Sequence, residues 1–338
     1  MSGLPASRPP KSCAYDRLGA ASLTQSLLVI LLMTVVVFVG LNAIGNPMDI
    51  LVGEDLNQAE RLQAIAHLGL DQPLWQQYLI FLKGAVHGNL GQSFVYHEDA
   101  MRLILQRLPA TFELAFSALF LAVVIGVPLG MFAGMYPDHP LSRLMMAASI
   151  VGFSLPAFWV ALMMIMLFSI TLGWLPASGR GETREWLGVQ WSWLTLDGLQ
   201  HLLLPALNLA LFKISLVLRL TRAGVREVLP QEFVKFARAK GLSPMRVMCM
   251  HVMRNTMIPV VTVLAMELGS TIAYAVVTES IFAWPGAGKL ILDSINMLDR
   301  PVVVAYLMVV VVIFVVLNLI VDGLYYLLDP RVRIEASR

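Results

Sequence analysis

Six long stretches with little or no charge constrain what this 338-residue chain can fold into. Four of them hold no charged residue: residues 18–48, 114–137, 144–179 and 301–321. The other two, residues 198–218 and 255–278, are each interrupted once, by Lys213 and by Glu267. Each stretch can supply the roughly 20 apolar residues that cross a bilayer as a helix. Because only 14% of the residues are charged, against about 25% in soluble proteins, we predict an all-α polytopic membrane protein with six transmembrane helices.

The distribution of basic residues predicts the orientation of these helices. With the amino terminus inside, the inner segments hold fifteen Lys and Arg residues, eight of them between Arg219 and Arg254. The outer segments hold eight, spread over more residues. Positive charge collects on the cytoplasmic side of membrane proteins. Both termini are therefore predicted to be cytoplasmic.

The remaining segments complete the predicted organisation. Residues 1–22 and 327–338 are predicted to be cytoplasmic tails, and 23–44 the first transmembrane helix. Residues 45–110 show helix-like spacing of apolar residues, with a helix start at Asp71-Gln72-Pro73, which predicts a small helical cap outside the membrane. Residues 111–326 would form the core.

Two outer loops between the later spans have a distinctive composition. The loop from Gly173 to Asp197 contains four tryptophans, a residue that favours the membrane–water interface, so we expect an interfacial anchor. The segment from Glu279 to Arg300 is broken by Gly and Pro, and it could dip back into the membrane where protein covers its backbone.

Ionisable residues inside spans are costly, and each one suggests a function. Glu113 and Asp322 lie at span ends, where capping or snorkelling explains them. Lys213 is expected to reach the cytoplasmic headgroups. Glu267 lies in the middle of its span beside Ser270 and Thr271, so these three residues are the candidates for lining a translocation path.

The basic loop between the fourth and fifth spans, residues 219–254, reads as two short helices joined at a glycine. Gly241 can adopt the left-handed conformation that closes a helix, and Ser243-Pro244 suits the start of the next. Such a loop could bind anionic lipid or a soluble partner. Apolar bulk from Phe233, Phe236 and Leu242 favours docking into a groove of another protein.

No sequence pattern indicates catalysis, a metal site or nucleic-acid binding. Ala287-Gly288-Lys289 resembles the end of a phosphate-binding loop, but Ala283 and Leu290 occupy positions that need Gly and Ser or Thr. The six histidines and two cysteines show no metal-ligand spacing. We therefore expect no cofactor on this chain, and any ATP would be bound by another chain.

Several motifs in a fixed order resemble one transporter family. The resemblance rests on short runs in the outer cap, in the second and third predicted spans, in and after the basic loop, and on both sides of the last span. They are residues 68–73 with Gln76 and Tyr78, 88–91, 108–114, 154–159, 237–242, His251 with 254–255, 259–262, 278–286 and 328–331. Together they resemble the permease subunits of binding-protein-dependent ABC importers, in the dipeptide/oligopeptide/nickel group.

The resemblance implies half of a translocation pore in a bacterial inner membrane. The implied partners are a second homologous permease, two ATPase subunits that bind ATP and Mg²⁺, and a periplasmic solute-binding protein. The implied coupling helix, which contacts the ATPase, comprises eight consecutive residues: Lys235, Phe236, Ala237, Arg238, Ala239, Lys240, Gly241 and Leu242.

This chain departs from the wider family in three respects. Where the family favours Glu-Ala-Ala ahead of the glycine, Lys235, Phe236 and Ala237 stand here. The charged residue Lys213 and the long polar amino-terminal tail are the other two departures. The resemblance leaves dipeptides, oligopeptides, glutathione-like peptides and nickel chelates open as substrates. An ion-gradient-driven secondary transporter, with Glu267 as the proton carrier, is the alternative from another class.

Overall fold

The computed structural model describes residues 24–25, 28–40 and 72–328, and these residues are mostly helical. The chain divides into two compact units, one of residues 106–292 and one of residues 1–105 with 293–338. The named helices and strands are α4 (Leu74–Val86), α5 (Ala100–Met135), α6 (Pro140–Ser154), α7 (Ala157–Met164), η1 (Ile165–Thr171), β1 (Arg184–Trp186), β2 (Val189–Trp191), η2 (Ser192–Leu194), α8 (Leu196–Val228), α9 (Glu232–Ala239), α10 (Pro244–Arg246), η3 (Val247–Val252), α11 (Met253–Ile281), α12 (Ala287–Asn296) and α13 (Arg300–Leu328).

Four helical segments in the described part of the chain are long and apolar enough to cross a membrane. They are Ala100–Met135, Leu196–Val228, Pro244–Ile281 and Arg300–Val321. A bent helix pair, α6 with α7 and η1, gives a fifth candidate if it counts as one span. The protein is therefore a helical membrane protein with four to five candidate spans among the described residues.

The uncharged stretch 144–179 does not form one straight span. α6 and the α7–η1 segment meet at an angle of 108°. Leu155 is extended, with φ −81° and ψ 137°, because the ring of Pro156 disfavours a helical residue before it. Pro156 then precedes the first turn of α7. The expectation of a single helix is thus wrong here, since freedom from charge does not ensure continuity of the helix.

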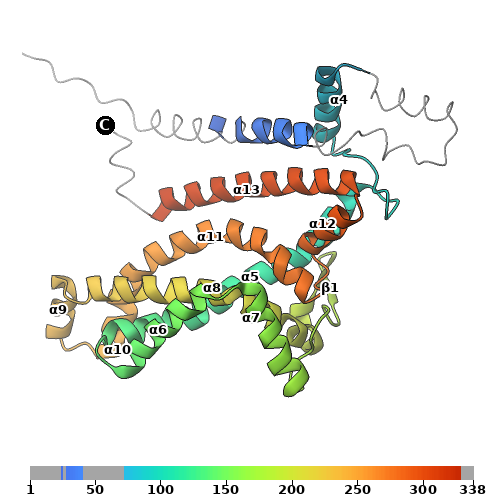
Figure 1. Cartoon of the computed structure of the whole chain (residues 1–338). Helices are drawn as coiled ribbons and strands as arrows, with labels where there is room; N and C mark the ends of the chain where they lie inside the picture. The colour runs from blue at the N-terminus through green and yellow to red at the C-terminus, as the bar shows by residue number, and fades with distance from the viewer. Residues whose placement is uncertain (1–23, 26–27, 41–71, 329–338) are drawn as a thin grey trace, which may run out of the picture. The chain divides into compact units, whose positions relative to one another are not determined.

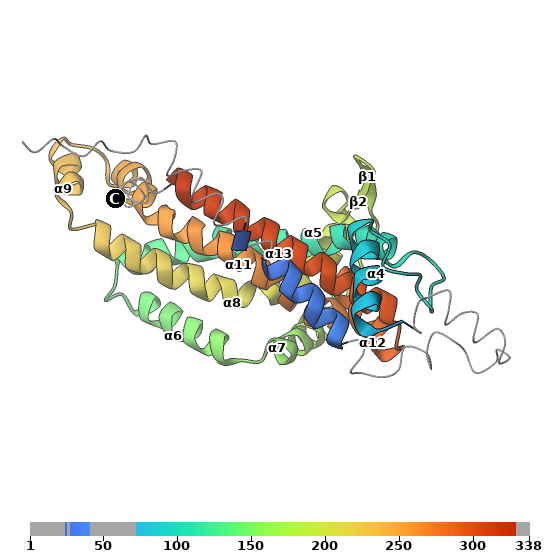
Figure 2. The ribbon, with the colours of Figure 1, turned by 90° about the horizontal axis from the view of Figure 1, so that it is seen from above.

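Helices α5, α8 and α11 form the centre of the unit of residues 106–292. Figures 1 and 2 show α8 and α11 side by side, with α6 and α7 also against α8. Gly126, Gly130 and Gly134 recur every fourth residue on the α5 face that meets α8. A methyl group at Gly130 would lie 2.6 Å from the backbone oxygen of Leu218, so only glycine permits this approach.

The other unit contains the described part of the first predicted span. An apolar helix covers Leu28–Gly40, and Val37 packs in a small core with Val304 and Met308 of α13. Thr34 Oγ1 and the Tyr78 hydroxyl of α4 are 2.8 Å apart. Contacts of this kind connect three helices that are distant in sequence.

The helix start predicted at Asp71-Gln72-Pro73 is confirmed, since α4 begins directly after Pro73. Residues 45–71, the larger part of the predicted cap, lie outside the described residues. The boundary predicted at residue 110 falls inside α5, which already begins at Ala100.

Candidate functional site

The loop between α8 and α11 is folded and packed. α8 continues to Val228, so the arginines at 219, 222 and 226 extend the same helix as predicted. Val234 and Ala237 of α9 are buried, 0% and 4% exposed, in a cluster with side chains of α8 and η3. α9 is therefore held by its apolar face against the ends of the long helices.

The opposite face of α9 is exposed and carries aromatic and charged groups. The Phe236 side chain is 61% exposed, and the Lys240 ammonium lies 4.6 Å from the centre of its ring. Lys235 Nζ contacts Glu232 Oε1 at 2.8 Å, with both side chains largely in solvent. Because charged side chains surround an exposed aromatic, this face suits a protein groove with acidic and apolar parts.

The turn after α9 matches the prediction at its glycine. Gly241 has φ +77°, a left-handed conformation in which a Cβ is strained, and Ser243 and Pro244 begin the next helix. The Ser243 side chain makes no capping hydrogen bond. Leu242 does not join the exposed apolar surface that was expected to dock. It packs against the buried cluster under α9, whereas Phe233 and Phe236 are exposed.

Lys213 and Glu267 form an ion pair between the middle parts of α8 and α11. Ser270 Oγ donates to Glu267 Oε2 at 2.7 Å and accepts from Lys213 Nζ at 3.0 Å. The expectation that Lys213 reaches the headgroups is wrong, since it is only 3% exposed. A carboxylate on the neighbouring helix stabilises its charge within the protein, and no single-helix pattern could show that pairing.

Of the three predicted path residues, the structure brings Glu267 and Ser270 together. Thr271 is fully buried, and its hydroxyl donates to the backbone oxygen of Glu267 at 2.6 Å. Its side chain is thus committed to its own helix, and Lys213 is the third member of the cluster instead.

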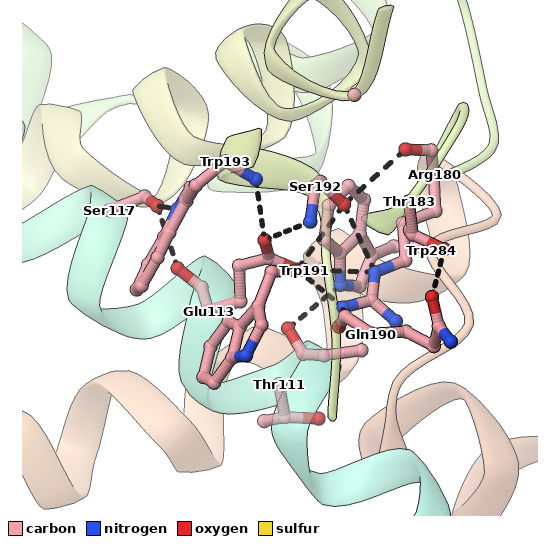
Figure 3. A network of polar contacts seen from close by, with 12 residues as sticks. Thr111, Glu113, Ser117, Arg180, Thr183, Gln190, Trp191, Ser192, Trp193 and Trp284 are labelled. Carbon is pink, nitrogen blue, oxygen red and sulfur yellow. Dashed lines mark hydrogen bonds and ion pairs between the residues drawn. The ribbon is translucent and has the colours of Figure 1, made fainter. Parts of the chain in front are cut away.

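A second carboxylate, this one buried, lies within α5, near the β1–β2 hairpin (Figure 3). Glu113 is fully buried; its Oε2 accepts from Arg180 Nη2 at 2.6 Å, and its Oε1 from the Ser192 backbone N–H at 2.6 Å. The Trp193 backbone N–H donates to the same Oε1 at 3.1 Å. Snorkelling or capping at a span end is therefore the wrong interpretation of Glu113. It holds the loop that precedes α8 against α5.

A third carboxylate, Glu279, lies close by in the same unit. Thr111 Oγ1 donates to it at 2.6 Å, and the Lys289 backbone N–H at 2.8 Å. Trp284 Nε1 donates to the backbone oxygen of Ala110 at 2.9 Å. Because a Cβ at Gly288 would overlap this carboxylate and the backbone of α11, the glycine that suggested a phosphate loop serves close packing.

The loop from Gly173 to Asp197, which holds four tryptophans, contacts α5 beside Glu113. Trp191 and Trp193 stack with their ring centres 5.1 Å apart, and Trp193 Nε1 donates to Ser117 Oγ at 2.9 Å. Trp174 and Trp186 are 66% and 61% exposed. Exposed indoles of this kind are compatible with the predicted interfacial anchor, which stays a prediction.

Among the residues that the structure describes, no group of three or more His, Cys, Asp or Glu is arranged to hold a metal ion. The Asp322 side chain and Cys13 are outside the described part, and Cys249 is an exposed free cysteine.

Comparisons with known proteins agree over most of the chain. Residues 126–334 match the family described as binding-protein-dependent transport system inner membrane component, and residues 20–115 match its amino-terminal family. The di/tripeptide transport system permease protein DppB of Pseudomonas aeruginosa is 38% identical over 302 residues, covering 86% of this chain and 90% of that protein. The dipeptide permease DppB of Escherichia coli K12 is 36% identical with the same coverage.

A solved structure shows the same fold at low identity. The inward-facing methionine ABC transporter MetNI superposes with a TM-score of 0.51 and 17% identity, covering 70% of this chain and 98% of that one. At this identity the likeness concerns the fold alone.

Proposed function

This chain belongs to the family of binding-protein-dependent transport system inner membrane components, and from that premise we propose that it forms half of the translocation pore of an ATP-driven peptide importer. The observation that carries the proposal is the α9 loop, whose apolar face is buried while Phe236 and its charged neighbours stay exposed. Relatives named as dipeptide and di/tripeptide permeases support di- and oligopeptides as the substrates.

The proposed assembly contains a second homologous permease, two ATPase subunits and a periplasmic solute-binding protein. This chain would bind no nucleotide, and ATP with Mg²⁺ would stay on the ATPase subunits. Six transmembrane helices with both termini in the cytoplasm are proposed for the bacterial inner membrane. The outer cap at 45–110, the core at 111–326 and the tails at 1–22 and 327–338 belong to the same proposal.

Coupling would proceed through the segment Lys235–Leu242. ATP-driven closure of the ATPase pair displaces a docked helix. The displacement passes to α8 and α11 because Val234 and Ala237 of α9 pack against the last turn of α8 and against η3, which continues into α11. No bond is made or broken on this chain. Its role is to convert the movement of a partner into alternating access of the path between helices.

The translocation path is proposed to pass Glu267 and Ser270, with Thr271 on the same turn of α11. The ion pair with Lys213 supports this, because an ionisable pair in the middle of spans faces protein or water rather than lipid. The comparisons do not favour the ion-driven alternative.

The proposal is tested by peptide uptake in cells that carry this chain with and without its ATPase subunits. Uptake is expected to require the ATPase subunits, and to be lost in Arg238→Glu although the variant still inserts into the membrane. Trp186→Ala is the control for uptake, since Trp186 is an exposed residue of β1, far from α9 in the same unit, and its loss should leave uptake unchanged. Uptake without any ATPase, or unchanged uptake in Arg238→Glu, would contradict the proposal.

A further inference from the structure

The ion pair between α8 and α11 needs an explanation beyond stability. Glu267 is the middle residue of α11. The attraction between two charges buried there compensates little or none of the free energy lost when both are removed from water. Apolar residues of similar volume would hold the two helices together as well. The charges are therefore better explained by something that binds them.

The two partners of the pair are not equally accessible. The Lys213 side chain is 4% exposed, whereas that of Glu267 is 26% exposed. The Lys213 ammonium also lies 5.4 Å from the centre of the Phe212 ring, and that ring stacks on Phe153 at 4.2 Å. Lys213 is thus enclosed by its partners, and the accessible charge is the carboxylate.

The two oxygens of this carboxylate have different roles. Lys213 Nζ and Ser270 Oγ both donate to Oε2, and neither of them makes its hydrogen bond to Oε1. An ionised carboxylate has about four acceptor positions, so donors on one oxygen leave capacity on the other. Lys213 and Ser270 together fix the orientation of the group through Oε2, which leaves Oε1 as an acceptor.

We propose that Glu267 is a binding site for the free α-ammonium group of the peptide in transit. A primary ammonium carries three donors and is strongly hydrated, so it needs an ionised acceptor when it leaves water. Oε1 would accept this group, and Lys213 and Ser270 are positioning residues that hold the carboxylate through Oε2. The inference rests on the proposed function, and it adds a chemical requirement for the substrate: an unblocked amino terminus.

The test uses the assembled transporter in proteoliposomes, with its own ATPase subunits and binding protein. The probes are dialanine and N-acetyl-dialanine, and the readouts are peptide taken up per ATP hydrolysed and the preference for the free amine. The binding protein is the same in every sample, so a change in preference between variants belongs to the permease. Glu267→Gln is expected to lower this preference about tenfold, since the acceptor keeps an oxygen but loses the negative charge that strengthens its hydrogen bond to an ammonium group.

Two further variants separate recognition from a merely structural role. Lys213→Glu with Glu267→Lys keeps an ion pair between the helices but moves the carboxylate to the enclosed position. This exchange is expected to restore thermal stability without restoring the preference. Thr278→Val removes a different hydrogen bond between the same helices, from Asn208 Nδ2 to Thr278 Oγ1 at 3.2 Å, and should leave the preference unchanged.

The failures can be told apart. If the wild-type transporter takes up no dialanine in an ATP-dependent manner, the proposed function fails for this substrate class. If the wild type transports dialanine and Glu267→Gln retains its preference, the ammonium site is overturned. Full recovery of the preference in the exchanged pair would also overturn it, because a structural ion pair would then suffice.

Discussion

The two ends of the unit of residues 106–292 use charge in opposite ways. Figures 1 and 2 show α9 at one end of this unit and the β1–β2 hairpin at the other. At the hairpin end, Glu113 and Glu279 are fully buried and accept several hydrogen bonds each. At the α9 end, the charged side chains of Lys235 and Glu232 lie in solvent.

This difference indicates different tasks for the two ends. A buried carboxylate with several donors fixes geometry, because removing it leaves each donor unsatisfied. Exposed charges around Phe236 contribute little to the fold, so they are available to a partner. We infer that the hairpin end holds the helices in place and that the α9 end transmits movement.

The largest expected effect is the loss of the buried carboxylate in Glu113→Ala. Arg180 and the backbone N–H groups of Ser192 and Trp193 would lose their acceptor, at a cost of about 3–5 kcal/mol in the free energy of unfolding. Monodispersity after heating, followed by fluorescence-detected size exclusion, measures this loss. Glu113→Gln keeps one acceptor oxygen, so its stability should lie between that of the wild type and that of Glu113→Ala. Equal stability of all three proteins would remove the contrast between the ends.

A smaller loss is expected where α5 and α8 approach most closely. Gly130→Ala places a methyl group against the backbone of Leu218, which costs roughly 1–3 kcal/mol in stability. Gly40→Ala is the control, because nothing lies within 4 Å of a Cβ at that position. The same heating assay applies, and an unchanged Gly130→Ala would show that the helices can separate without cost.

At the α9 end, function should change while stability does not. Phe236→Ala removes an exposed aromatic anchor, and we expect ATPase affinity to fall by about tenfold or more. Co-purification at graded concentrations of ATPase measures the affinity, and heating measures the stability. If Phe236→Ala lowered the heat stability but left the affinity for the ATPase unchanged, the α9 end would have the structural task that is assigned here to the hairpin end.

The turn after α9 offers a milder change. Gly241→Ala places a Cβ in a left-handed conformation, at a cost of roughly 1 kcal/mol to the turn, and should lower uptake. Asn tolerates this conformation, so Gly241→Asn should transport better than Gly241→Ala. The ratio of the two uptake rates is the measurement, and a ratio of one would mean that the turn does not matter.

The smallest effect is expected from Glu232→Gln. The contact with Lys235 is exposed to solvent, and such pairs contribute little to stability. Heating should give the same curve as for the wild type. A clear loss of stability would mean that the exposed pair does take part in holding α9.

Sequence patterns predicted the parts of the molecule that depend on local chemistry. The turn at Gly241 and the helix start after Pro73 follow from backbone preferences of single residues, and the structure confirms both. The four long apolar segments likewise follow from length and composition.

These local patterns could not predict which residues from distant parts of the sequence contact one another. Lys213 and Glu267 are each the only charge in their stretches, a coincidence that could have suggested a pair, but single-helix reasoning sent Lys213 to the headgroups. Glu113 and Arg180 are separated by 67 residues, and only the folded chain brings them together. The glycines at 126, 130 and 134 did carry a readable signal, the four-residue spacing of closely packed helices.

Whether the exposed face of α9 contacts the ATPase is best measured by site-directed cross-linking. In a chain with Cys13→Ser and Cys249→Ser, a single cysteine is introduced by Lys235→Cys, which leaves the Phe236 ring in place, or, as the control, by Trp186→Cys. A short bifunctional reagent is then added to the assembled, transport-competent complex. We expect a product that joins this chain to the ATPase from Lys235→Cys and none from Trp186→Cys. No ATPase product from Lys235→Cys, or an equal yield from Trp186→Cys, would contradict the proposed contact.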